Sequence, residues 1–537
     1  MNYDTLYQPY PSNRYCVTAA NGIVASGSNL ATAAGLEVMQ KGGNAIDAAI
    51  ATAAALTVTE PTSNGLGSDA FALVWVKDKL YGLNASGYSP YDISIRKVKD
   101  RCPDGKIPQF GWIPVMVPGC VDAWGKLIDR FGKLTLKDVL APAIRYASEG
   151  YPVSPMLSKL WEMECDVFKK NFSGKKEHGE LFRLFTKDGE PYRFGEIVKL
   201  PDIAKTLKMI GEQGRDVFYK GEIASALVKQ SQRDGGFFTM KDLEDYEAVW
   251  VDPISVKYRG YDVCEIPPNG QGIVALMALN ILKEFRFEDR DSIETLHKQI
   301  EAIKIAFADA KKYVTDPEYM NIDYHELLRP EFGRERAKLI QEKAILPEPC
   351  DLSKSGTVYL CTADREGNMV SYIQSNYMGF GSGIVVEGYG VSLQNRGADF
   401  SLNENDANAL GSHRRSYHTI IPGFLMKDGK PVGPFGVMGG YMQPQGHVQV
   451  LMNMIDFNLN PQMALDKPRF QWIEGKKILL EPSFDDEIVK QLVEKGHDAG
   501  KASGSVSFGR GQIIQRLDNG VLVAATESRT DSNIACY

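Results

Sequence analysis

A β-hairpin is predicted by the sequence Gly356-Thr-Val-Tyr-Leu-Cys-Thr-Ala-Asp-Arg-Glu-Gly-Asn-Met-Val-Ser-Tyr-Ile-Gln-Ser375. Thr357 begins a strand of alternating residues, Asp364–Asn368 turns the chain, and a second strand returns to Ser375. Residues 346–356 precede the hairpin and indicate an exposed linker, because they show no periodicity and contain two prolines. A boundary of this kind suits a chain that is cut between linker and strand.

Thr357 carries a hydroxyl directly after a glycine, which can adopt backbone conformations closed to other residues. In a strained backbone, such a hydroxyl can attack the preceding carbonyl. An N-to-O shift followed by ester hydrolysis would leave Thr357 as a new N-terminus. Its α-amine, with an ordinary pKa of about 8, would then serve as the base for its own hydroxyl. The alternative is an ordinary surface hairpin without a catalytic role.

The composition is that of an ordinary globular protein. The 537 residues are 43% hydrophobic, 24% charged and 10% aromatic, which excludes disorder and low complexity. At about 150 residues per domain, this length suggests three or four domains. The net charge of −7, without a basic block, argues against nucleic-acid partners. The longest apolar stretch, 48–58, is too short and too rich in Ala and Thr to cross a membrane.

The sequence also points away from secretion, metals and cofactors. Its first residues lack the basic and apolar regions of a signal peptide. Eight cysteines without CxxC spacing are typical of reduced thiols, so we expect a cytoplasmic protein. Seven histidines form neither HExxH nor HxH, which disfavours a metal site. We expect no cofactor.

Capping residues and apolar periodicity predict a mixed α/β chain. Ser28 caps a helix that ends at Gly42-Gly43, Asn44 caps an Ala-rich helix that ends before Pro61, and Pro118-Gly119 precedes a third. Further helices are predicted near 135–149, 201–213, 218–232, 271–285, 292–314 and 331–343, and strands at 254–258 and 261–266.

A series of short motifs runs along the chain in a fixed order. They are Gly42-Gly-Asn-Ala-Ile-Asp-Ala-Ala49, Glu60-Pro61, Ser63-Asn-Gly-Leu-Gly67, Val117-Pro-Gly119, Asp245-Tyr246, Tyr258-Arg-Gly-Tyr261, Pro267-Pro-Asn-Gly-Gln-Gly272, Gly356-Thr357, Asp364-Arg-Glu-Gly-Asn368, Phe380-Gly-Ser-Gly383, Asp399-Phe-Ser401, Gly439-Gly440 and Pro468-Arg-Phe470. With these motifs the chain, from about Ser12 to Tyr537, resembles the gamma-glutamyltranspeptidase family of N-terminal nucleophile hydrolases. It is most similar to the cytoplasmic, glutathione hydrolase-like branch.

The resemblance implies an α+β fold, a four-layer αββα sandwich. It also implies autocleavage into a large subunit, 1–356, and a small subunit, 357–537, which stay together in one interlocked folding unit. The expected partners are a small-molecule amide substrate and the two subunits themselves. A homo-oligomer of such heterodimers is an open alternative.

The resemblance also assigns roles at the site. Thr357 matches the nucleophile, Ser375 the hydroxyl that assists it, and Gly439 and Gly440 the pair beside the oxyanion hole. The segments expected to bind substrate contribute Asn376, Asn395, Arg396, Asp399, His418 and Thr419. Asp399 matches the carboxylate that holds the α-amino group, and His418-Thr419 stands where relatives often have two serines.

Two departures bear on the substrate. Ser86 stands where gamma-glutamyl enzymes have an arginine that grips the α-carboxylate, and the loss of that guanidinium removes its strongest charge partner. Arg396 could supply the charge from the other side. The segment between Asp399 and His418 is shorter than in relatives with a lid, which favours hydrolysis over transfer.

The first hypothesis is hydrolysis of gamma-glutamyl amides such as glutathione through an acyl-enzyme. The alternatives are an amidase for glutaryl, oxamate or other short dicarboxylic amides, and an unprocessed binding homologue without catalysis. A nucleotide-binding enzyme is disfavoured, because the glycine-rich stretch Gly379-Phe-Gly-Ser-Gly383 is not GxGxxG.

Overall fold

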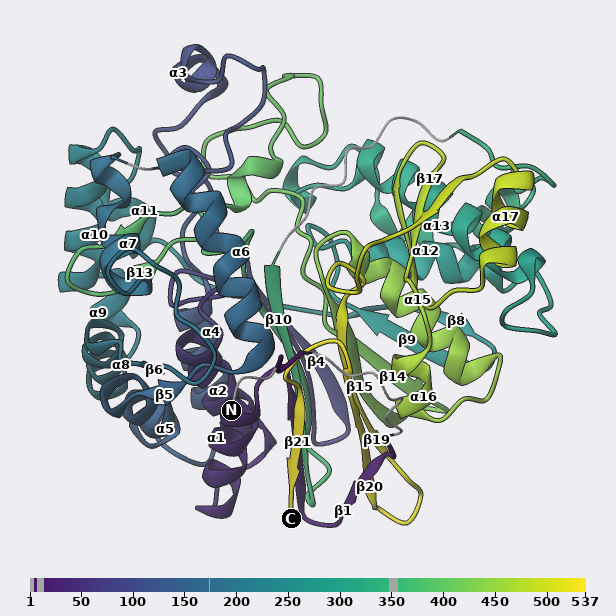
Figure 1. Cartoon of the computed structure of the whole chain (residues 1–537), viewed down its shortest axis with the longest axis horizontal. Coiled ribbons are helices and arrows are strands. Elements are labelled where there is room, and N and C mark those ends of the chain that lie inside the picture. The colour runs from purple at the N-terminus through teal and green to yellow at the C-terminus, as the bar shows by residue number, and fades with distance from the viewer. Residues whose placement is uncertain (1–3, 7–13, 173, 347–355) are drawn as a thin grey trace.

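Two seven-stranded antiparallel sheets pack face to face at the centre of the molecule (Figure 1). The computed structural model describes residues 4–6, 14–172, 174–346 and 356–537. The predicted linker falls almost wholly on 347–355, outside the described residues.

The first sheet has the order β1 (Val17–Ala19), β20 (Leu522–Thr526), β19 (Arg510–Arg516), β15 (Lys430–Met438), β14 (Gly423–Lys427), β9 (Tyr261–Glu265) and β8 (Ile254–Tyr258). The second has the order β21 (Asn533–Cys536), β2 (Gly22–Ser26), β10 (Gly356–Asp364), β11 (Met369–Tyr377), β3 (Asp69–Val76), β4 (Lys79–Ala85) and β7 (Val249–Val251). Strands from before and after residue 356 are thus neighbours in both sheets. The predicted hairpin, β10–β11, lies in the middle of its sheet, which excludes the surface-ribbon alternative.

Helices cover the outer faces of both sheets, so the predicted four-layer αββα arrangement is confirmed (Figure 1). On the side of the second sheet lie α1 (Asn29–Gln40), α2 (Ala45–Thr59), α4 (Cys120–Phe131), α5 (Leu136–Glu149), α6 (Pro155–Phe172), α7 (Gly179–Phe185), α8 (Pro201–Gln213), α9 (Asp216–Tyr219), α10 (Glu222–Arg233) and α11 (Met240–Glu244). On the side of the first sheet lie α12 (Gly272–Leu282), α13 (Ile293–Tyr313), α14 (Pro330–Ala337), α15 (Met442–Ile455), α16 (Pro461–Asp466) and α17 (Asp486–Glu494).

Shorter elements complete the structure. They are α3 (Ile95–Val98), the 3-10 turns η1 (Lys99–Arg101), η2 (Lys176–His178), η3 (Pro317–Tyr319), η4 (Tyr324–Leu328) and η5 (Arg396–Asp399), the paired strands β5 (Tyr151–Pro152) and β6 (Ile197–Val198), the paired strands β12 (Val385–Val386) and β13 (Val391–Ser392), and a small sheet of β16 (Phe470–Glu474), β17 (Lys477–Leu480) and β18 (Asp498–Lys501).

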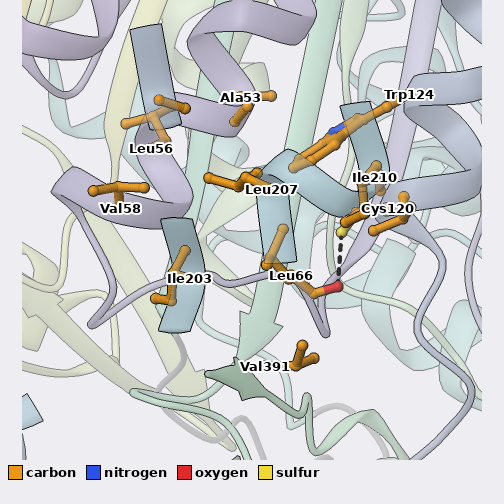
Figure 2. Packing of buried hydrophobic residues seen from close by; sticks show 14 of the residues in the cluster. Ala53, Leu56, Val58, Leu66, Cys120, Trp124, Ile203, Leu207, Ile210 and Val391 are labelled. Atoms are coloured by element: carbon orange, nitrogen blue, oxygen red, sulfur yellow. Dashed lines mark hydrogen bonds between the residues drawn. The ribbon is translucent and has the colours of Figure 1, made fainter. Parts of the chain in front are cut away.

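Each interface between layers has its own apolar core. In β10, Leu360 packs toward the helices, whereas Tyr359 and Cys361 pack between the sheets, because successive side chains of a strand point to opposite faces. Figure 2 shows part of the helix-side core, in which α2, α4 and α8 bring together Leu56, Trp124 and Leu207. Every residue of the Ala-rich helix α2 is buried, which places its backbone close to the sheet.

The predicted helix starts are confirmed at Ser28 and Asn44, whose side chains accept backbone N–H bonds of α1 and α2. Two boundaries differ. The helix predicted at 218–232 is split before Gly221, where a Cβ would lie 2.8 Å from Val217 O. The helix predicted at 331–343 ends at Ala337. Beyond it, the backbone O of Gln341 lies 2.8 Å from His297 Nε2, a contact outside the helix.

No helix in the described part of the chain combines the length and apolar character needed to cross a bilayer. The seven cysteines in that part have free thiols, as predicted, and Cys350 lies outside it.

A buried ion network connects three segments near the C-terminus, around residues 469, 481 and 527–529. Arg469 Nη2 donates to Glu527 Oε2 at 2.9 Å, and Arg529 Nη1 donates to Glu527 Oε1 at 2.6 Å. Arg529 also donates to both oxygens of Glu481. Burial alone would raise the pKa of Glu527, but the two guanidinium groups outweigh it and lower that pKa to about 2.

We expect Glu527→Gln to lower the thermal unfolding midpoint, and to do so most at neutral pH. The depressed pKa stabilises the fold above the ordinary value of 4.5, by on the order of 3 kcal/mol, and this stabilisation is lost as the pH falls toward 2. Calorimetry between pH 7 and pH 3.5 should show the midpoints of wild type and variant converging. A constant gap would contradict the assignment.

Candidate active site

The predicted nucleophile and its assisting hydroxyl are brought together at the start of β10. Thr357 is wholly buried, and its Oγ1 lies 3.0 Å from the Oγ of Ser375 in β11. The pairing of β10 with β11 is irregular between Gly356 and Val358, so Thr357 lies at a local break in the ladder. Tyr377 N–H donates to Ser375 Oγ at 2.8 Å. Chemistry at Thr357 therefore has a second, oriented hydroxyl within reach.

Asp399 is linked to these hydroxyls through Tyr377. The backbone of Tyr377 has a φ of 78°, and its phenol donates to Asp399 Oδ1 at 2.6 Å. Tyr441 OH lies 3.3 Å from the same oxygen. Asp399 Oδ2 accepts no hydrogen bond from the described residues, so it can receive a donor from a ligand.

Arg396 connects Asp399 to Thr419. Its Nη1 lies 3.6 Å from Asp399 Oδ2 and donates to Thr419 Oγ1 at 2.7 Å. The guanidinium carbon lies 3.8 Å from the ring centre of Tyr377. The Arg396 side chain is 1% exposed, and its Nε and Nη2 have no hydrogen-bond partner among the described residues. This edge of the guanidinium is therefore available to an anion.

Gly439 and Gly440 follow β15 in conformations that favour glycine, with φ values of 135° and 58°. A Cβ on Gly439 would lie 3.2 Å from Gly509 Cα. Gln271 Nε2 donates to Gly440 O at 2.8 Å and to Thr419 O at 2.6 Å. One side chain thus fixes both the glycine pair and the Thr419 segment, and it completes a continuous chain of contacts from Thr357 to Gly440.

His418 is paired with Asp69, and both side chains are almost fully buried. His418 Nε2 lies 2.9 Å from Asp69 Oδ2, Gly87 N–H donates to Asp69 Oδ1 at 3.0 Å, and Ile420 N–H approaches His418 Nδ1 at 3.4 Å. This pattern places the ring proton on Nε2, facing a carboxylate. Burial, together with Arg396 and Arg415, holds the pKa of His418 well below its ordinary value. Burial raises the pKa of Asp69 to about 7, although Arg396 and Gly87 N–H lower it.

Both ring nitrogens of His418 are thus engaged within the protein, and the two predicted asparagines are engaged as well. Asn376 Oδ1 accepts from Ser68, and its Nδ2 donates to Ser392. Asn395 Oδ1 accepts from Met378 N–H, and its Nδ2 donates to Gln109 O. All three side chains therefore stabilise the surrounding loops through these hydrogen bonds.

Ser86 places no charge at the site. Its Oγ donates to Asn84 Oδ1 at 2.7 Å and lies 3.2 Å from Asn269 Nδ2. The short segment after Asp399 folds back on itself through a bridge between Ser401 and Ala409. Asn408 Nδ2 donates to Asp399 O at 2.7 Å and thereby ties this segment to the site.

One buried cluster in the described part of the chain has the residue types of a metal site, namely His297, Glu301 and His497. Lys304 is also fully buried, and its Nζ donates to Glu301 Oε1 at 2.6 Å. An ammonium group therefore already pairs with the carboxylate that a metal ion would need. The arrangement is a buried ion pair rather than a metal centre.

Three residues of the site were not predicted from the sequence: Asp69, Gln271 and Tyr377. Gln271 belongs to the motif Pro267–Gly272, which identified the segment but did not indicate what the Gln271 side chain does. Tyr377 lies two residues beyond Ser375, and its role depends on a positive φ that a sequence pattern does not show. Asp69 lies two residues after the motif that ends at Gly67, and only the register opposite Ser375 reveals its position.

Comparison with known proteins supports the resemblance. A family model described as gamma-glutamyltranspeptidase matches residues 31–537. The chain is 35% identical to the glutathione hydrolase-like YwrD proenzyme of Bacillus subtilis (strain 168), over 90% of this chain and 91% of that protein. It is 31% identical to the oxamate amidohydrolase proenzyme of Klebsiella pneumoniae, over 97% of this chain and 99% of that protein.

A solved structure shows the same fold. The crystal structure of a cephalosporin acylase from Bacillus halodurans superposes with a TM-score of 0.97 at 52% identity, and covers 100% of this chain and 99% of its own. The similar proteins thus include enzymes named for different amide substrates.

We expect Asp69→Asn to destabilise the protein by about 1–3 kcal/mol, because an amide has one acceptor oxygen and can serve Gly87 N–H or His418 Nε2–H but not both. The measurement is the thermal unfolding midpoint at pH 8. Asp78→Asn is the matched control, since Asp78 is exposed in a turn with a φ of 59° that asparagine tolerates. Equal midpoints for the two variants would refute the carboxylate's bridging role.

Proposed function

The chain belongs to the gamma-glutamyltranspeptidase family, and on that premise we propose that it is an autoprocessing threonine amidohydrolase for amides of small, carboxylate-bearing acids. The first proposed substrates are gamma-glutamyl amides such as glutathione. The observation that carries the proposal is the 3.0 Å contact between the hydroxyls of Thr357 and Ser375 at the break in the β10–β11 ladder.

The first proposed step is cleavage of the chain itself. Thr357 Oγ1 attacks the carbonyl carbon of Gly356, a C–O bond forms, and the Gly356–Thr357 C–N bond breaks. The amide thereby becomes an ester, and the α-amine of Thr357 takes up the proton. Water then hydrolyses the ester, which releases the carboxylate of Gly356 and restores the hydroxyl. Ser375, in hydrogen-bond contact, is proposed to assist the transfer of the hydroxyl proton.

Turnover repeats this chemistry on an external amide. The freed α-amine of Thr357 removes the proton from Oγ1, which attacks the substrate carbonyl. The proposed oxyanion hole is formed by backbone N–H groups at Gly439 and Gly440, where no side chain intervenes and Gln271 fixes the peptide. The amine leaves with a proton, and water then releases the acid from the ester.

The proposed binding groups for the acyl portion are Asp399, Arg396 and Thr419. Asp399 Oδ2 can accept from an α-ammonium, and the open edge of Arg396 can donate to a carboxylate. His418, Asn376 and Asn395 are proposed to act indirectly, because their polar atoms bind the protein itself.

A second candidate is the hydrolysis of glutaryl, oxamate or other short dicarboxylic amides. It is favoured by Ser86, whose hydroxyl is held by Asn84 and Asn269 and offers no cation to a gamma-glutamyl α-carboxylate. It is also in keeping with similar proteins named as an oxamate amidohydrolase and a cephalosporin acylase. The remaining alternative is a binding protein that never cleaves itself.

The purified protein should separate on denaturing electrophoresis into chains of about 39 and 20 kDa, the smaller beginning at Thr357 by N-terminal sequencing, because the 59.5 kDa chain is cut after residue 356. Thr357→Ala, which lacks the hydroxyl, should remain one chain, and Thr357→Ser should still be cut. An intact wild type after long incubation would support the binding-protein alternative.

We expect water rather than an amine to accept the acyl group. The segment after Asp399 is short and folded back on itself, so it provides no lid that would exclude water. With gamma-glutamyl-4-nitroanilide, added glycylglycine should change nitroaniline release by less than about twofold. Glutaryl-4-nitroanilide, assayed in parallel, decides between the two acyl groups, and Thr357→Ala gives the background. A large stimulation by glycylglycine would identify a transferase.

A further inference from the structure

Arg415 is a buried cation without a counter-ion. The residue is 8% exposed, and its Nε and Nη2 have no hydrogen-bond partner in the described part of the chain. It forms no ion pair with a described carboxylate, and Asp316 Oδ2 accepts the backbone N–H of Arg415 at 2.9 Å. A buried charge that is left unpaired is costly. The position is therefore suited to an anion that arrives from outside.

The unpaired atoms have the geometry of a carboxylate receptor. Nε and Nη2 lie on one edge of a guanidinium, and their parallel N–H bonds match the two oxygens of a carboxylate. Arg396 leaves the same edge without a partner among the described residues. Two open guanidinium edges thus occur in segments that meet at the candidate site.

A column of stacked rings holds Arg415 in place. Its guanidinium carbon lies 4.2 Å from the ring centre of Tyr88. His413 stacks on Tyr88 at 4.2 Å and 10°, and on Tyr91 at 4.2 Å and 3°. A guanidinium packed against such a column is ordered before a ligand binds, which reduces the entropy that binding costs.

Arg415 is related to the reacting hydroxyls through Asp69. Its charge and that of Arg396 act on the same pair, Asp69 and His418. Asp69 lies opposite Ser375 in the β3–β11 ladder, and Ser375 contacts Thr357.

The column also relates Arg415 to the missing arginine at position 86. Tyr88 follows Ser86 by two residues, and Gly87 between them donates to Asp69. The guanidinium on Tyr88 therefore packs on the segment that contains position 86.

We propose that Arg415 binds the free carboxylate of the acyl group and makes the site selective for amides of acidic acyl groups over uncharged ones. The proposal rests on the proposed function and adds a specificity-determining residue to it. The carboxylate forms two N–H···O bonds with Nε and Nη2, and no covalent bond changes at this position.

The test compares glutaryl-4-nitroanilide with butyryl-4-nitroanilide, which lacks the carboxylate. In Arg415→Gln, kcat/KM for the glutaryl amide should fall roughly 10- to 100-fold, mainly through KM, while the value for the butyryl amide changes less than about threefold. Arg415→Lys should be intermediate. Arg414→Gln is the matched control, because the adjacent Arg414 packs on Tyr319 and bonds to Ala407 O. Complete self-cleavage of each variant verifies folding.

Equal losses on both amides, or no loss on either, would overturn the role of Arg415. A second measurement is independent of turnover: glutarate should raise the thermal midpoint of the wild type, and this shift should be clearly smaller in Arg415→Gln, where only Arg396 remains, but persist in full in Arg414→Gln. If the wild type binds glutarate through Arg415 yet neither cleaves itself nor hydrolyses amides, the proposed function fails while the carboxylate site stands. If glutarate gives no shift in an active wild type, the carboxylate site fails alone.

Discussion

The site depends on the backbone hydrogen bonds that β10 makes to β2 on one side and to β11 on the other. These ladders lie in the middle of a sheet and are covered by apolar cores on both faces. They fix the position of Thr357 at the end of a central strand and bring Ser375 opposite it. A hydroxyl on a surface hairpin would be solvated and mobile, whereas here its surroundings are set by the same bonds that build the fold.

Around this strand end, the protein buries more polar groups than its fold requires. Tyr377, Asp399, Arg396, Thr419 and Gln271 form one chain of contacts that reaches Gly440. Most of these groups are satisfied by each other, and the few that are not are one carboxylate oxygen, of Asp399, and one guanidinium edge, of Arg396. Unsatisfied buried groups are rare in folded proteins. The unpaired atoms of Asp399 and Arg396 lie on side chains linked by hydrogen bonds and ion pairs to Thr357, which supports a binding role for this region.

Much of the architecture could be predicted from local chemistry. The caps at Ser28 and Asn44, the hairpin at 357–375 and the paired glycines all have short-range causes, and the ordered motifs supplied the arrangement of layers. Partners across the fold could not be predicted in this way. Whether His418 faces a substrate or Asp69 depends on two segments 349 residues apart, and Arg415 becomes notable only because Nε and Nη2 of its guanidinium have no hydrogen-bond partner in the described part of the chain. The helix predicted at 218–232 failed for a local steric reason at Gly221 that propensity alone does not reveal.

The alternation of strands from before and after residue 356 has a consequence for the lifetime of the molecule. Neither portion alone contains all the strands of either seven-stranded sheet, so each portion needs the other to complete them. If the chain is cut after residue 356 as proposed, reassembly from the unfolded state becomes a bimolecular reaction and loses the high effective concentration that one polypeptide provides. A processed molecule that unfolds could then not refold by the route through which the intact chain folded. Its lifetime would be governed by the rate of unfolding rather than by a folding equilibrium.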